Sequence, residues 1–145
     1  MSTRNLLGIL ASGALLSSLL SASGVAADPS GAVKSPVQSL MQRDLPDMPG
    51  KEVIMLTVTS PPGGVSAPHR HDAEVFVYML EGSMTMQVDG QAPVTLTPGQ
   101  TFHEGPSDIH RQAANTSNTQ PAKFLVFMIK DKGKPVTLPV PDLHH

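Results

Sequence analysis

The chain has no cysteine and no tryptophan, and it has only one tyrosine and four phenylalanines among 145 residues. Without cysteine, a disulfide is impossible, and thiolate is excluded both as a nucleophile and as a metal ligand. A small fold of this kind must be stabilised by packing, by a metal or by oligomerisation. The formal net charge is only −2, with no basic block. Nothing therefore indicates a nucleic-acid partner.

Long apolar runs are also scarce, and the one at the N-terminus has the layout of a secretory signal peptide. One arginine precedes the apolar stretch, and Val25 and Ala27 occupy the −3 and −1 positions of a cleavage site. The alternative is an uncleaved membrane anchor, but the apolar core is shorter than the ~20 residues of a membrane span. We expect residues 1–27 to be removed. The mature chain, residues 28–145, would be periplasmic or secreted, with no stable membrane anchor.

Turn-forming residues are abundant, with fourteen prolines and twelve glycines spread along the chain. They separate short β-rich runs, and no run after residue 28 keeps a helical period of 3.6 residues. Residues 28–50 read as an arm or linker in which 35–45 forms a short strand or one helical turn. Residues 51–145 read as one domain. The expected strands are 52–59, 74–80, 83–88, 94–97, 101–104 and 122–130, with 133–140 as an edge strand. The predicted fold class is all-β, either a sandwich or a barrel.

The residues that indicate chemistry lie in APHRHDAE, residues 67–74. In a strand, residues i and i+2 share a face, so His69 and His71 can share one metal ion. Glu74 follows shortly after, and His110 comes from a separate segment behind another turn. Imidazole and carboxylate without thiolate suit iron, manganese, nickel, copper or zinc. The alternative interpretation is a polar strand surface that binds nothing.

These motifs resemble those of the cupin superfamily of small jelly-roll β-barrels. Gly63, His69, His71 and Gly82 keep the frame of its first motif. TPGQTFHEGPSDIHRQAAN is similar to its second motif, with His110 at the ligand position. The resemblance spans about residues 51–130. It implies a single cupin-type barrel that holds one divalent metal on the three histidines and binds a small organic molecule. Similar small cupins often pair, which implies a homodimer, with the arm and the last strand covering sheet edges.

The sequence departs from the family at the carboxylate. The family glutamate would fall at Val75, and Glu74 lies one residue early. A shift of one residue turns a strand side chain to the opposite face, so Glu74 can be a metal ligand only if a bulge absorbs the shift. His103 and Glu104 are adjacent, and only one of them can point into a barrel. We favour Glu104, as a fourth ligand or as a catalytic general base.

Two classes of function remain open. The first is a metal-dependent enzyme, slightly favoured, of dioxygenase, decarboxylase, lyase or isomerase type. Its apolar cavity would be lined by residues such as Val77, Met86, Phe102 and Phe127. The second is a non-catalytic module that binds a small molecule or a metal, and a metal serving only to stabilise the barrel is a third interpretation.

Methionine raises a further possibility for copper. Met84 and Met86 alternate on one expected strand with Met79 nearby, and methionine with histidine can bind copper in an exported protein. Filling of an irregular barrel interior is the favoured explanation, because methionine adapts to such spaces and aromatic residues are few.

Overall fold

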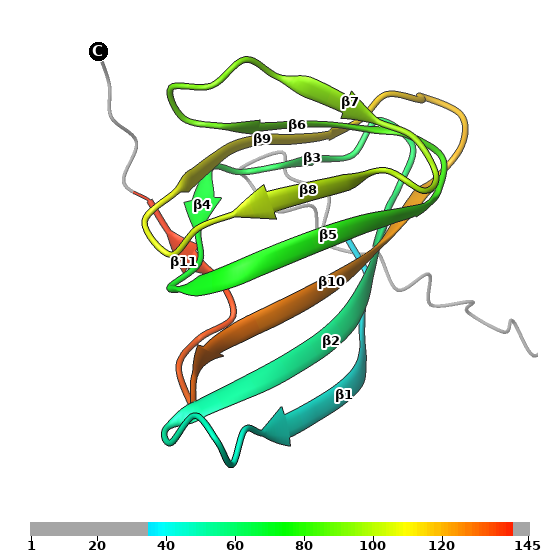
Figure 1. The fold of residues 1–145 in the computed structure, drawn as a ribbon. Coiled ribbons are helices and arrows are strands. Elements are labelled where there is room, and N and C mark those ends of the chain that lie inside the picture. The colour runs from blue at the N-terminus through cyan, green and yellow to red at the C-terminus, as the bar shows by residue number, and fades with distance from the viewer. Residues whose placement is uncertain (1–34, 141–145) are drawn as a thin grey trace, which may run out of the picture.

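The computed structural model describes residues 35–140, and these form an all-β fold of two antiparallel sheets (Figure 1). The predicted signal peptide and the first part of the arm lie outside the described residues. None of the described residues is helical, so this part of the chain contains no helix able to cross a bilayer. The strands are β1 (Val37–Asp44), β2 (Lys51–Ser60), β3 (Val65–Ser66), β4 (His69–Arg70), β5 (Ala73–Glu81), β6 (Met84–Val88), β7 (Val94–Leu96), β8 (Thr101–Glu104), β9 (Ile109–Asn115), β10 (Ala122–Asp131) and β11 (Leu138–Pro139).

The first sheet has the order β1-β2-β10-β5-β8, and the second follows β11-β4-β9-β6-β7 with β3 paired to β9. The predicted all-β class is confirmed. Segment 35–45, for which strand and helix were both open, contains the eight-residue strand β1, which pairs with β2 along its length. The arm thus adds an edge strand to the first sheet. The last strand is also an edge, as its prolines predicted.

The core lies between the sheets and follows the period of two expected for strands. On β10, Phe124, Val126 and Met128 are buried, while the residues between them are half-buried on the outer face. Met79, Met84 and Met86 are at most 1% exposed and belong to the same core cluster. This burial is what the packing interpretation of the methionines predicts.

A tight turn joins β5 to β6 at Gly82, which has a φ of +70°. A Cβ atom there would lie 2.8 Å from the carbonyl oxygen of Pro121. Both the left-handed backbone and the close approach require glycine. The motif glycine therefore fixes the hairpin that follows the first histidine pair.

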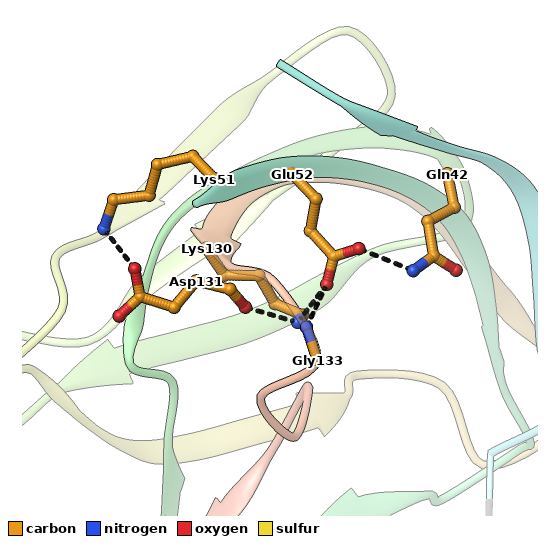
Figure 2. A network of polar contacts seen from close by, with 6 residues as sticks. All are labelled: Gln42, Lys51, Glu52, Lys130, Asp131 and Gly133. Atoms are coloured by element: carbon orange, nitrogen blue, oxygen red, sulfur yellow. Dashed lines mark hydrogen bonds and ion pairs between the residues drawn. The ribbon is translucent and has the colours of Figure 1, made fainter. Parts of the chain in front are cut away.

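A buried ion pair lies in the first sheet, where β2 begins and β10 ends (Figure 2). Lys130 Nζ lies 2.6 Å from Glu52 Oε1, and both side chains are 2% exposed. Glu52 also accepts bonds from Gln42 Nε2 at 2.6 Å and from the backbone N–H of Gly133 at 3.1 Å. The bond from Lys130, followed by that from Gln42, lowers the pKa of Glu52 to about 2. The pair ties β1, β2 and β10 together at one end of the barrel.

Candidate metal centre

The structure brings the three predicted histidines together on the second sheet. His69 lies in β4 directly opposite His110 in β9, and His71 follows β4. The ring centroid of His69 is 5.0 Å from that of His71 and 5.0 Å from that of His110. One ring nitrogen from each of the three lies within 4.8 Å of the others. Three neutral imidazoles at this spacing are able to hold one transition-metal ion.

Backbone carbonyls orient two of the rings. His69 Nδ1 donates to the carbonyl oxygen of Ala67 at 2.8 Å, and His71 Nδ1 donates to that of Val136 at 2.5 Å. A carbonyl can only accept, so the proton of each neutral ring sits on Nδ1 and the lone pair sits on Nε2. Such outer hydrogen bonds fix the tautomer of a metal-binding histidine. Sequence reasoning missed both carbonyls, since any residue type supplies one.

The environment also disfavours the charged form of His69. Burial lowers its pKa, and the neighbouring His110 and His71 lower it further, against the opposing hydrogen bond to Ala67. A neutral imidazole has a free lone pair at neutral pH, as a metal ligand requires.

Glu104 is the carboxylate beside the three rings. It is 2% exposed at the end of β8. Its Oε2 lies 3.1 Å from His110 Nδ1 and 3.7 Å from His71 Nε2. Among the described side chains, Glu104 Oε2 and His110 Nε2 are the buried polar atoms without a hydrogen-bond partner. Buried polar atoms are nearly always satisfied. Two orphaned atoms beside three clustered rings fit a site built for a cation.

Glu74 is not part of this cluster. Its carboxylate Oε2 lies 2.7 Å from His103 Nε2, and the two side chains are 46% and 54% exposed. The bulge that would turn Glu74 inward is absent, because β5 pairs regularly with β8 and Val75 stands opposite Glu104. The carboxylate thus comes from the neighbouring strand, at the position facing the expected one. Of the adjacent His103 and Glu104, the inward residue is Glu104, as favoured.

A cavity of about 690 Å³ opens over the cluster, and its lining includes the three histidines and Glu104. Val77 and Met86 line it, as expected, but Phe102 and Phe127 are not among the lining residues. Phe102 packs against the core with its ring 5.8 Å from that of His110. Phe127 lies on the outer face beside Phe76, since the inward positions of β10 are the even-numbered ones.

Comparison with known proteins gives a consistent picture. A family model described as "Cupin domain" matches residues 56–128. Among curated proteins, none matches the chain. A protein from Klebsiella pneumoniae with a double-stranded β-helix domain is 13% identical over 74% of this chain and 86% of its own, with a TM-score of 0.58.

Two similar solved structures carry functional names. A polyketide cyclase from Streptomyces resistomycificus is 23% identical over 77% of this chain and 76% of its own, with a TM-score of 0.57. A DMSP lyase from Ruegeria pomeroyi is 24% identical over 63% of this chain, with a TM-score of 0.55, and this chain spans only 45% of that protein. At these identities the likeness establishes the double-stranded β-helix fold.

Proposed function

The chain belongs to the cupin family, and from this premise we propose that it is an exported enzyme that uses one divalent transition metal to transform a small oxygen-bearing organic molecule. The observation that carries the proposal is the convergence of His69, His71 and His110 beside the buried, unsatisfied carboxylate of Glu104. A surface without function would not leave a buried carboxylate oxygen and a buried ring nitrogen unpaired.

The residues fit a metal. The three histidines would hold it, and the donor set of imidazole and carboxylate suits iron, manganese, nickel, copper or zinc. When bound, such an ion supplies a Lewis acid that polarises a substrate oxygen. Glu104 would complete the ligand set or accept a proton from the substrate.

The position of Glu104 favours catalysis over binding alone. An enzyme needs an acid–base group beside the metal, and Glu104 Oε2 faces both His110 and His71 from inside the barrel. The names of the lyase and the cyclase lend support to small-molecule chemistry on this fold. Dioxygenase, decarboxylase, lyase and isomerase reactions are the classes to screen. A non-catalytic binding module is the alternative, and it predicts that Glu104→Gln leaves every screened activity unchanged.

Elemental analysis tests the proposal. The protein is purified without a histidine tag, beside His69→Ala/His71→Ala and the control variant His103→Ala, which alters an exposed histidine on the opposite face. We expect about one metal equivalent in the parent and in the control, and none in the double variant. An absence of stoichiometric metal in the parent, even after reloading with each ion, would refute the metal-dependent function.

A further inference from the structure

Three histidines and one carboxylate form a single cluster in the lining of the cavity. Its charged or metal-binding lining residues are the three histidines and Glu104, and its other polar lining residues are Ser35, Ser66 and Thr137. Among the described residues, no lysine, arginine, asparagine, glutamine or tyrosine lines it. On this basis, and resting on the proposed metal centre, we infer that the cavity selects a compact, largely apolar molecule with a single oxygen-bearing end.

The walls give the apolar part of this argument. Besides this cluster the cavity is lined largely by apolar side chains, of which Leu56, Val75, Met86, Val126 and Met128 are buried. Each methylene that a ligand buries against such a wall improves its affinity about fourfold. A second charged group placed there would lose its water and find no partner, which costs affinity steeply.

Nearby cations do not offer that partner. Lys130, the buried cation among residues 35–140, already binds Glu52 Oε1 at 2.6 Å and the carbonyl oxygen of Asp131 at 3.0 Å. Arg70, between His69 and His71, is half-buried and binds Asp72 Oδ1 at 2.6 Å. Among the described residues, a dicarboxylate therefore finds one place for a charged group and no partner for its second carboxylate.

The volume gives the size of molecule that the cavity itself can enclose. At about 30 Å³ for each water-sized group, a cavity of about 690 Å³ has room for roughly 20 non-hydrogen atoms. A medium-chain acid or a small ring system meets this limit, with its oxygens at the histidines and its carbon skeleton along the wall.

Methionine methyl groups provide a binding readout that does not need a known reaction. Met86 and Met128 line the cavity, whereas Met41 and Met48 are exposed at 38% and 46% and serve as internal controls. Protein labelled with ¹³C in the methionine methyl groups is loaded with zinc and titrated with octanoate or with suberate, which has the same number of carbons and a second carboxylate. We expect octanoate to shift the two cavity signals and suberate to bind at least about tenfold more weakly. Equal affinities, or shifts at the exposed methionines only, would overturn the inference.

A charge introduced at the cavity provides the reciprocal test. Val65 on β3 lines the cavity and is 53% exposed, so Val65→Lys adds an ammonium group with little risk to folding. We expect this variant to move the ratio of affinities at least about threefold towards suberate. The control Val94→Lys alters a residue 42% exposed on β7, outside the cavity, and leaves the ratio unchanged. If the ratio of the two affinities is unchanged in Val65→Lys, the absence of a cationic side chain in the cavity does not explain the preference for octanoate.

Metal content measured on the same samples separates the two claims. A protein that takes up neither zinc nor any of the other four ions contradicts the proposed function. If that protein still binds octanoate at Met86 in preference to suberate, apolar selection stands without the metal. A zinc-loaded protein that binds suberate as tightly as octanoate contradicts the inference alone.

Discussion

Glu104→Gln should have opposite effects on the metal-free and the metal-bound protein. In the metal-free protein, Oε2 of this 2%-exposed carboxylate has no hydrogen-bond partner, although His110 Nδ1 is 3.1 Å away. An unsatisfied buried polar group costs about 1–3 kcal/mol, and more when it is charged. An amide removes the charge and brings an N–H donor towards the free ring nitrogens. We therefore expect Glu104→Gln to raise the free energy of unfolding of the metal-free protein by about 1 kcal/mol.

The same substitution should weaken metal binding. Loss of a carboxylate that either binds the ion or supports a metal-binding histidine typically costs 10- to 100-fold in affinity, or about 1.4–2.8 kcal/mol. Isothermal titration calorimetry with zinc gives the metal affinity. Urea unfolding with and without metal gives the free energies of unfolding of the metal-bound and the metal-free protein. The gain in stability on adding metal should shrink in the variant by about the same energy.

Glu74→Gln is the matched control, because it makes the same chemical change on the adjacent strand but on the outer face. Glu74 is 46% exposed and pairs with His103. Exposed pairs contribute about 0–1 kcal/mol, so this variant should change neither stability nor metal affinity by more than that. If the two variants lose metal affinity equally, or if Glu104→Gln destabilises the metal-free protein, the assignment of Glu104 to the site is refuted.

Four further predictions concern the barrel and its assembly. Lys130→Met leaves the buried Glu52 unpaired and should lower the urea midpoint of unfolding far more than Lys51→Met, which removes an exposed ion pair. The folded pKa of Glu52 is lowered to about 2, so the contribution of its charge to stability is present above about pH 4.5 and is lost as the pH falls towards 2. The free energy of unfolding, measured as a function of pH, should therefore fall over this range in the parent but not in Lys130→Met. Gly82→Ala should cost more than about 1 kcal/mol and more than Gly90→Ala, since both have positive φ but only the first also has a close contact. The protein should be a homodimer in which a second copy covers the sheet edges formed by β1 and β11. A monomeric mass in light scattering would contradict this.

The fold class could be predicted from the sequence because the residues that end its strands act locally. Glycine and proline mark the strand ends, and the turn at Gly82 needs a left-handed residue wherever the rest of the chain lies. The status of 35–45 could not be decided in this way. Every residue of β1 is exposed, so no buried face imposes a period of two, and the strand is defined by its pairing with β2.

The histidines of the site could be found, but the source of the carboxylate could not be decided from spacing alone. His69 and His71 could be found because residues i and i+2 share a face of an extended segment, and His110 because it follows a turn after another expected strand. Glu74 has the right residue type at nearly the right spacing, yet the regular pairing of β5 with β8 beside it turns Glu74 outward. Glu104 occupies the position across from Val75, and only the register between β5 and β8 reveals that the two are neighbours. Cross-strand register depends on contacts distant in sequence, and a single sequence does not display it.

The barrel contains two buried carboxylates that differ in their hydrogen-bond partners. Glu52 accepts bonds from Lys130, Gln42 and the backbone of Gly133, and its depressed pKa reflects a charge that the fold itself neutralises. Glu104 is as deeply buried, yet its Oε2 has no hydrogen bond within the described residues. A chain that can satisfy one internal carboxylate with three donors leaves the other facing imidazoles. Because an unsatisfied buried polar atom is destabilising, this contrast supports the proposed cation site at Glu104 on grounds independent of any family resemblance.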